Sequence, residues 1–325
     1  MREAIELAGG EVRFETKLTD VKVSEGEIQQ LQFNGTDWMD FSDVVLATGH
    51  SARDIFYLLH ERNIKIEAKP FAIGVRIEHQ QELIDHIQYH GDSDNPYLPP
   101  ASYALVEQVD GMGVYSFCMC PGGIIAPCAT EQEEVVTNGW SPSKRNNPYS
   151  NSGIVVSVEP KDLPNYKPND PFVSLNFQKK VERDCWEAAG KTQRVPAQRM
   201  IDFVEGKLSK DFPKTSYRPG IVSADLNKVL PPLLSIRLRK AFVAFGKKMK
   251  GYYTNEAVLH APESRTSSPV SIPRNPETLE HIEVRGLYPC GEGAGYAGGI
   301  ISAAIDGINC VDAIVTKRVQ SRLTS

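Results

Sequence analysis

Near its C-terminus the chain reads LYPCGEGAGYAGGI, residues 287–300. Within this stretch, residues 293–298 (GAGYAG) satisfy the G-x-G-x-x-G pattern that opens a dinucleotide-binding βαβ unit. Such a unit continues through a helix and a second strand to an acidic residue about twenty positions on, which binds a ribose. Position 318 is an arginine, and too few residues follow Gly298 for both a helix and a second strand. The motif therefore does not open a cofactor domain in this sequence.

The composition is that of a globular protein. Of 325 residues, 41% are hydrophobic and 24% are charged, and the net charge of −5 gives no general attraction to nucleic acid or anionic lipid. The six cysteines have irregular spacing, so we expect reduced thiols and no disulfide framework. No apolar run approaches the roughly 18 residues of a membrane span, and no signal peptide is visible. We therefore expect a cytoplasmic protein without a membrane partner.

The hydrophobic pattern changes twice along the chain. Alternating apolar residues at 12–41, separated by turn pairs such as Asn34-Gly35, predict a small antiparallel meander. The run DVVLATG at 43–49 then predicts a strand buried on both faces of a parallel sheet. Between about residues 60 and 262, most of the prolines occur and no βα rhythm is found. We predict an α/β fold in which residues 1–60 and 262–325 form a discontinuous, partial Rossmann-like domain, and 61–261 form an inserted α+β domain.

The order of residues in the glycine-rich stretch suggests its role. An acidic residue follows a strand and precedes the glycines and the start of a helix, an arrangement that directs N–H groups and the positive helix end towards an anion. This order is similar to the closing motif of flavoproteins with two dinucleotide-binding domains, in which the acid binds the ribitol of FAD. The same proteins carry an Ala-Thr-Gly strand end after a meander. A glycine turn that merely packs a helix against a strand is the alternative.

By this resemblance, Glu292 binds the ribitol, and the backbone N–H groups of residues 293–297 face the pyrophosphate. The residues that the resemblance assigns to cofactor binding are Ala47, Thr48, Gly49, Gly291, Glu292, Gly293, Ala294, Gly295, Tyr296, Ala297, Gly298 and Gly299.

Five segments together resemble one family, the FAD-dependent dehydrogenases distantly related to the HI0933-like flavoproteins. They are KPFAIGVRIEH (69–79), FCMCPGG (117–123), TNGWSPSKR (137–145), ESRTSSPV (263–270) and LYPCGEGAGYAGGIISAAIDGI (287–308). The resemblance implies an FAD-dependent oxidoreductase with a small-molecule substrate. Family members begin with a fingerprint βαβ unit that holds the adenosine half of FAD, and this sequence has none. We therefore expect FAD binding to be weak or absent in this chain alone, and an exposed sheet edge to favour self-association.

Two segments are candidates for a substrate pocket, and the first of them lies in the inserted domain. Cys118 and Cys120 are expected on one face of a strand, where they are poorly placed for a disulfide, and with Cys128 they lack a fourth metal ligand. We predict no metal site. Gly122 and Gly123 would let the backbone approach the flavin or the substrate. Small buried strand residues are the alternative.

The second candidate segment surrounds Arg265, whose planar guanidinium suits a substrate carboxylate or the negative charge of reduced flavin. We predict that residues 117–123 and 263–268 lie on opposite sides of one concave pocket, whose lining includes Cys118, Cys120, Gly122, Gly123, Arg265, Thr266 and Ser267. A solvated loop is the alternative for the second segment. The sequence identifies no general acid or base; Tyr252 and Tyr253 are candidates by residue type alone.

A basic stretch at residues 237–250 offers a different interpretation of the chain. Arginines and lysines flank an amphipathic helix there, which is compatible with a flavin-fold module that binds RNA or another polyanion without redox activity. A solvated basic helix face explains the same pattern, so we regard nucleic acid as the less favoured partner.

Overall fold

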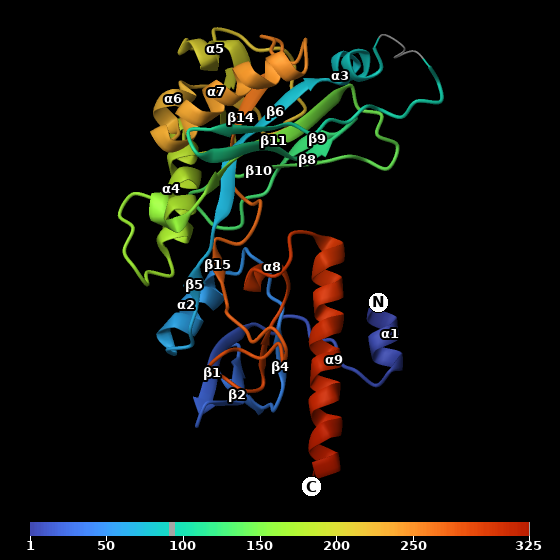
Figure 1. Ribbon diagram of the computed structural model, residues 1–325, viewed down its shortest axis with the longest axis vertical. Helices are drawn as coiled ribbons and strands as arrows, with labels where there is room; N and C mark the ends of the chain where they lie inside the picture. The colour runs from blue at the N-terminus through green and yellow to red at the C-terminus, as the bar shows by residue number, and fades with distance from the viewer. Residues whose placement is uncertain (91–94, 325) are drawn as a thin grey trace. The chain divides into compact units, whose positions relative to one another are not determined.

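The computed structural model describes residues 1–90 and 95–324 (Figure 1). It is an α/β protein whose chain divides into two compact units. Unit 1 comprises Met1–Glu67 and Val270–Ser325, and unit 2 comprises Ala68–Pro269. The divisions fall at 67/68 and 269/270, a few residues beyond the expected 60/61 and 261/262. Among the described residues, no helix is both long and apolar enough to span a membrane.

Unit 1 begins with helix α1 (Arg2–Leu7) and an antiparallel meander of β1 (Leu18–Ser24), β2 (Glu27–Phe33) and β3 (Asp37–Asp40). The structure confirms the meander. Its tight turns depend on residue type, because Asn34 and Gly35 both adopt positive φ, at 53° and 80°, which asparagine and glycine tolerate best.

A parallel pair of strands follows, formed by β4 (Val44–Leu46) and β16 (Leu287–Pro289). Helix α2 (Arg53–Glu61) comes after β4, and helices α8 (Gly291–Ala294) and α9 (Ile300–Thr324) come after β16. Strand β4 is less buried than predicted, since the Val45 side chain is partly exposed. Two short strands, β5 (Glu67–Ala68) and β15 (Val270–Ser271), pair where the chain leaves and re-enters unit 1.

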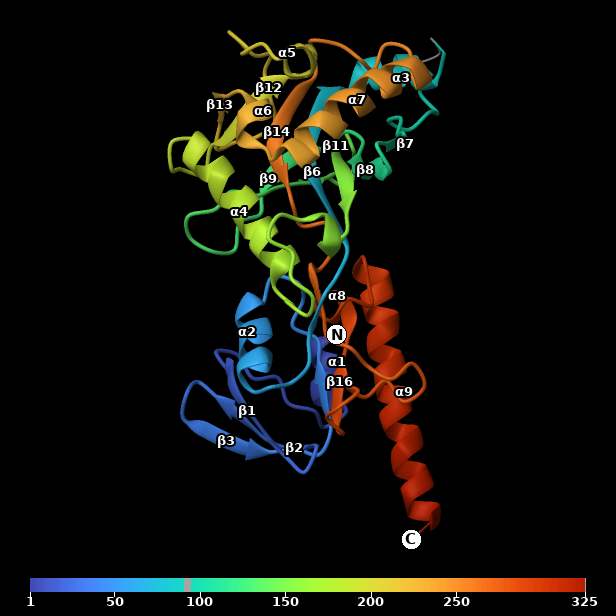
Figure 2. The ribbon, with the colours of Figure 1, turned by 60° about the vertical axis from the view of Figure 1, so that its left-hand side comes forward.

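Unit 2 is built on a seven-stranded mixed sheet with the order β13-β12-β14-β6-β11-β8-β7 (Figure 2). Only β12 and β13 pair in parallel, and the remaining neighbours are antiparallel. The strands are β6 (Phe71–Gln80), β7 (Val106–Val109), β8 (Met112–Cys120), β11 (Tyr149–Val158), β12 (Val195–Arg199), β13 (Ile221–Ser223) and β14 (Val258–Glu263). A separate antiparallel ribbon consists of β9 (Ile124–Pro127) and β10 (Thr137–Trp140). A backbone hydrogen bond of 2.9 Å from Lys69 N to Pro269 O joins the two ends of unit 2.

The helices of unit 2 are α3 (Gln81–Gln88), α4 (Val173–Ala188), α5 (Met200–Glu205), α6 (Leu226–Val229) and α7 (Pro232–Lys248), with a 3₁₀ turn at Pro160–Asp162. Both figures show α7 lying across the sheet. Its buried residues, among them Leu238 and Phe242, join one core cluster with Val75 and Ile77 of β6. Because side chains alternate along a strand, Arg76 and Glu78 project from the opposite face.

Helix α9 is the long C-terminal helix in both figures. Most of its large apolar side chains are exposed. The residues that it buries are small or polar, with Asp306 and Cys310 the most buried. The exposed apolar residues are Ile300, Ile301, Ile305, Ile308, Val311, Val315, Val319 and Leu323, and Ile301 is 73% exposed. A contiguous apolar face of this kind marks an interaction surface. The helical spacing of Ile300, Ile301, Ala304, Ile308 and Val311 predicts a helix with one apolar stripe, but the isoleucines and the valine of this stripe are exposed in the structure.

We expect the purified chain to self-associate through this face of α9. Replacing two of its isoleucines, Ile305→Glu with Ile308→Glu, should weaken the association by about 3 kcal/mol or more, because each buried isoleucine contributes roughly 1.5–3 kcal/mol. Sedimentation velocity over a range of concentrations measures the effect. Ile236→Glu, at an exposed position of α7, is the matched control and should change nothing. A wild-type chain that stays monomeric at high concentration would contradict the prediction.

Candidate functional site

The glycine motif of unit 1 begins at the end of β16. Cys290 N donates to Leu46 O at 3.0 Å, which continues the parallel pairing with β4 by one residue. Gly291 and Gly295 adopt positive φ, 74° and 90°, and between them lies the single turn of α8. The chain then runs through a short connection to α9. The motif therefore does not lead straight into a long helix, as the sequence suggested.

This short turn changes the expected set of backbone donors. Gly295 N donates to Glu292 O and Tyr296 N donates to Gly291 O, each at 3.0 Å. The prediction that these two amides face a pyrophosphate is therefore wrong, because both are used within the turn. The N-terminus of α9 remains as an element suited to an anion, since the first amides of a helix carry the positive end of its dipole.

The two sequence motifs of unit 1 lie against each other. A Cβ on Gly293 would lie 2.4 Å from the carbonyl oxygen of Gly49 and 2.7 Å from its carbonyl carbon, so the two backbones touch there. Gly49 itself has a φ of 77°. The strand end at residues 47–49 and the acidic glycine turn thus form one edge, at the carboxyl ends of parallel strands. In open α/β sheets this is where ligands bind.

Glu292 lies at this edge with its side chain 30% exposed, and its Oε2 is 3.4 Å from His50 Nδ1. Gly298 and Gly299, just before α9, have no positive φ, and a Cβ added at either position would meet no atom within 4 Å. Neither conformation nor packing in the described residues therefore accounts for glycine at these positions. A partly exposed carboxylate, followed in the chain by bare backbone at a helix N-terminus, could bind a ligand with both hydroxyl groups and a phosphate.

Behind the turn lies a polar cluster that sequence reasoning missed. Asp306 Oδ2 accepts the N–H of Gly291 at 2.7 Å, and the Asp306 carboxylate binds Arg274 through both guanidinium nitrogens, at 2.6 and 3.1 Å. Burial would raise the pKa of Asp306, but the hydrogen bonds from Arg274 and Gly291 outweigh it and the pKa is lowered. The sequence signal for this cluster was an acidic residue on the helix that follows a glycine turn. This feature is too common to predict an ion pair.

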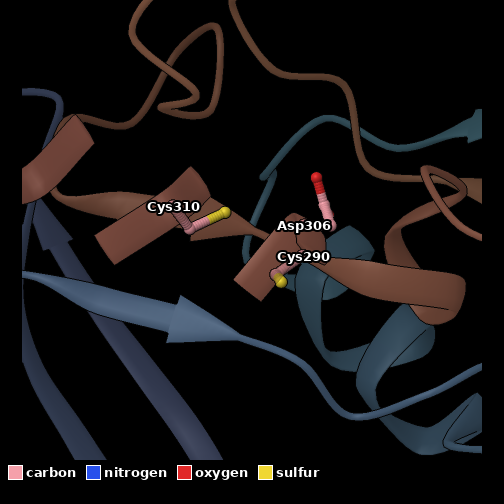
Figure 3. A group of neighbouring side chains, drawn as sticks. All are labelled: Cys290, Asp306 and Cys310. Atoms are coloured by element: carbon pink, nitrogen blue, oxygen red, sulfur yellow. The ribbon is translucent and has the colours of Figure 1, made fainter. Parts of the chain in front are cut away.

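Two thiols flank this carboxylate (Figure 3). The Sγ atoms of Cys290 and Cys310 and a carboxylate oxygen of Asp306 all lie within 4.8 Å of one another, and all three residues are buried. Burial raises the pKa of Cys290 to about 12. Arg274 Nη1 is 3.6 Å from Cys310 Sγ, so a guanidinium already supplies positive charge here, where a metal ion would otherwise bind.

In unit 2, four of the five quoted segments meet at the fully buried side chain of Arg76. Its Nε and Nη2 donate to Glu263 at 2.7 and 2.9 Å, and its Nη1 donates to Asn151 Oδ1 at 2.8 Å and to Cys118 O at 3.3 Å. A Cβ on Gly139 would lie 2.3 Å from Arg76 Nη1. The structure thus brings residues 117–123 and 263 together, through a buried ion pair that fills the space between them.

The two cysteines of the FCMCPGG segment do not share a strand face. Cys118 has a φ of 43° and an exposed side chain, whereas Cys120 is buried and its Sγ contacts Cys118 O at 3.2 Å. The pairing of β8 with β11 shifts register at this point, which turns Cys118 outward. The expectation of a shared face is therefore wrong.

Packing accounts for the two glycines that follow. A Cβ on Gly122 would lie 1.8 Å from Arg145 O, and one on Gly123 would lie 2.8 Å from Trp140 O. The surrounding protein backbone therefore requires glycine here, without any approach of a ligand. Their assignment to a substrate pocket stays a prediction.

Arg265 is held by two buried carboxylates. Its Nε is 2.9 Å from Glu182 Oε1 and its Nη2 is 3.0 Å from Glu134 Oε1, and its side chain is 3% exposed. Thr266 Oγ1 donates to Ala72 O at 2.6 Å, and Ser267 is partly exposed. The guanidinium that was predicted to bind a substrate carboxylate thus already binds two carboxylates of the protein. The solvated-loop alternative fails too, because Arg265 and Thr266 are buried.

Two further candidates from the sequence are Tyr252 and the basic stretch at residues 237–250. Tyr252 is fully buried, and burial raises its pKa far above the ordinary value. In the basic stretch, Lys240 pairs with Asp110 at 2.7 Å and Lys248 pairs with Glu107 at 3.0 Å. Acidic neighbours thus balance part of the charge that a polyanion would bind.

A hollow of about 460 Å³ lies elsewhere in unit 2, between α4 and the start of α7. Apolar side chains of Val173, Phe177 and Leu230 form part of its wall, and Lys180 and Asp184 lie at its rim. None of the residues predicted for the substrate pocket lines it. Sequence patterns gave no indication of this hollow, because its walls come from segments far apart in the chain.

Residues 70–266 match the family described as FAD-dependent protein, C-terminal domain-like, and the chain belongs to that family. It is also similar to a protein of Clostridium beijerinckii (strain ATCC 51743 / NCIMB 8052) whose name states no function, with 41% identity over 321 residues. The match covers 98% of this chain but 59% of the relative. The chain thus spans about three fifths of the length of that relative.

The Arg76–Glu263 pair should be essential to unit 2. Glu263→Gln leaves a buried guanidinium without its counter-charge, and breaking such a pair typically costs about 3–5 kcal/mol. Urea unfolding followed by circular dichroism measures the loss. The matched control is Lys180→Gln, which breaks an exposed i,i+4 pair with Asp184 and should cost less than about 1 kcal/mol. Equal stability of Glu263→Gln and wild type would refute this assignment.

Two buried histidines should make unit 2 sensitive to acid. Burial lowers the pKa of His79 and of His260 from 6.5 to about 4. An unfolded chain binds protons at these groups below pH 6.5, whereas the folded chain does so only near pH 4. The stabilisation from neutral histidine is thus present above pH 6.5 and lost as the pH falls towards 4, by about 2–4 kcal/mol per residue.

Urea unfolding at pH 7.5 and pH 5 tests this pH dependence. His79→Gln and His260→Gln should each flatten it, whereas His90→Gln, at an exposed position of the same unit, should leave it unchanged. A stability of the wild-type chain that does not vary between these two pH values would contradict the prediction.

Proposed function

We propose that this chain is the part of an FAD-dependent oxidoreductase that holds the ribitol side of the flavin nucleotide, with a small-molecule substrate. One observation carries the proposal: in a member of an FAD-dependent family, the partly exposed carboxylate of Glu292 lies where two parallel strands end, with Gly293 against Gly49. The bare backbone at Gly298 and Gly299 supports it, because it leaves room for a ligand at the start of α9.

Each of these residues would have a separate role in binding. The Glu292 carboxylate would accept hydrogen bonds from ribitol hydroxyls, with His50 holding its orientation. The first amides of α9 would face a phosphate, since helix N-termini favour anions. The flavin would supply the redox chemistry, and the protein would bind and orient it.

Substrate recognition is proposed for unit 2. The side chain of Cys118 is exposed, and the buried ion pair fixes the backbone of this residue, because Arg76 Nη1 donates to Cys118 O. A rigid support of this kind keeps contacting groups in place. The roles of Arg265 and Thr266 would be to hold the segment before β15 rather than to touch the substrate.

The chain alone should bind FAD weakly, because these features engage the ribitol and one phosphate but offer no site for the adenosine. Each ~1.4 kcal/mol of missing interaction lowers affinity tenfold, so we expect a Kd in the micromolar range or weaker. Fluorescence titration of FAD gives the Kd. Glu292→Gln should raise it by about tenfold or more, because charged hydrogen bonds contribute roughly 1.5–3 kcal/mol.

The control for this experiment is Glu277→Gln, which removes an exposed carboxylate of unit 1 that lies outside the glycine motif. Equal FAD affinity of wild type and Glu292→Gln would sink the ribitol assignment. A yellow protein with one tightly bound FAD per chain would show that other residues complete the site, and the weak-binding proposal would be abandoned.

A further inference from the structure

We infer that Arg274 and Asp306 form a clamp that positions the Glu292 carboxylate for the flavin nucleotide, an inference that rests on the proposed function. Both side chains are largely buried, so their proposed role is to position the ligand-binding residue and not to touch the ligand. Their role would be to fix the backbone on the N-terminal side of Glu292, while the Gly293–Gly49 contact fixes the other side.

Arg274 and its near neighbour Ile272 contact three separate parts of the motif. Its Nη1 donates to Pro289 O, at the end of β16, at 2.7 Å. Its backbone N donates to the hydroxyl of Tyr296 at 2.9 Å, and its guanidinium lies 3.8 Å from the centre of the Tyr296 ring. Two residues earlier, Ile272 N donates to Ala294 O at 3.1 Å. The 272–274 segment therefore holds the turn before and after Glu292.

Asp306 connects this segment to α9. One of its oxygens accepts both the Gly291 N–H and Arg274 Nη1, and the other accepts Arg274 Nη2. Gly291 precedes Glu292 directly, so the carboxylate of Asp306 sets the position from which the Glu292 side chain departs. The same contact holds the first third of α9 against the end of β16.

Stability alone is a poor explanation for this arrangement. The side chains of Arg274 and Asp306 are 8% and 9% exposed, and a buried ion pair often stabilises a fold no better than apolar residues of the same size. A bidentate guanidinium–carboxylate pair does fix geometry, because both partners are planar and bind in one relative orientation. A fixed geometry is what a hydrogen-bonding carboxylate at a cofactor site requires.

The two cysteines beside the clamp raise the question of a metal site. Cys290, Asp306 and Cys310 have the side chains of a metal site (Figure 3), but Arg274 contacts the carboxylate and one sulfur. A cation bound there would have to displace a guanidinium that makes four polar contacts. The cluster is therefore a guanidinium site.

The test is a double-mutant cycle on the chain with added FAD. Arg274→Gln should raise the Kd by about tenfold, and Arg274→Lys, which keeps the charge but loses the fork, should raise it less. If Arg274 acts through Glu292, its replacement should have little further effect in the Glu292→Gln background. Arg285→Gln, which breaks an exposed ion pair with Glu27 in the same unit, is the matched control and should leave the Kd unchanged.

A second readout needs no cofactor. Amide hydrogen exchange of residues 290–296 should accelerate in Arg274→Gln and in Asp306→Asn, while exchange in the β1–β3 meander stays as in the wild type. Asp306→Asn keeps an acceptor for Gly291 N–H and is the milder change if Arg274→Gln does not fold. Circular dichroism identifies a variant that has lost its fold.

The outcomes separate the two proposals. If Glu292→Gln weakens FAD binding but Arg274→Lys and Arg274→Gln do not, the clamp is overturned and the proposed function stays intact. Additive effects in the cycle, or unaltered exchange at 290–296, also overturn the clamp. A wild-type chain that binds no FAD at millimolar concentration overturns the proposed function and this inference together.

Discussion

A guanidinium with no exposed surface must find its counter-charge and its hydrogen-bond acceptors inside the protein, and Arg76 finds them on three other strands. Glu263 belongs to β14, Asn151 to β11 and Cys118 to β8, so one side chain connects four of the seven strands of the sheet. The requirement extends to the β9–β10 ribbon, where only glycine fits at position 139. Much of what surrounds the exposed Cys118 follows from satisfying this single charge.

The same solution recurs at two other arginines. Arg265 is held by Glu134 and Glu182, and Arg274 is held by Asp306; each partner is far away in the sequence. Such pairs add little net stability compared with apolar packing, but they penalise any arrangement that separates the charges. They therefore explain how long irregular connections in this chain reach defined positions.

The sequence predicted the helices and strands better than it predicted the tertiary contacts that each of them makes. Asn34-Gly35 identified a turn, and the apolar run at 43–49 identified a strand, because both are local properties of the chain. Periodicity predicted the helix α9, but an apolar stripe does not say what covers it. The register shift that turns Cys118 outward depends on β11, more than thirty residues away.

Residue type alone was a poor guide to the roles of Gly122, Gly123 and Arg265. Gly122 and Gly123 are required by protein backbone, and the guanidinium of Arg265 is consumed by carboxylates that no local pattern connects to it. By contrast, the contact of Gly293 with Gly49 agrees with the order of the two motifs, because the ends of paired parallel strands meet at one edge.

The hydrogen bond between Lys69 and Pro269 has a consequence for how such a protein can change over time. A domain whose two ends meet can be placed in a loop of a host fold without stretching that loop, and the entropy of closing the host loop hardly changes with the length of the insert. Unit 2 could therefore be exchanged for another domain, or lengthened within its own loops, while the strand ends at 47–49 and 290–293 keep their contact. The same unit 1 could in this way carry different second domains.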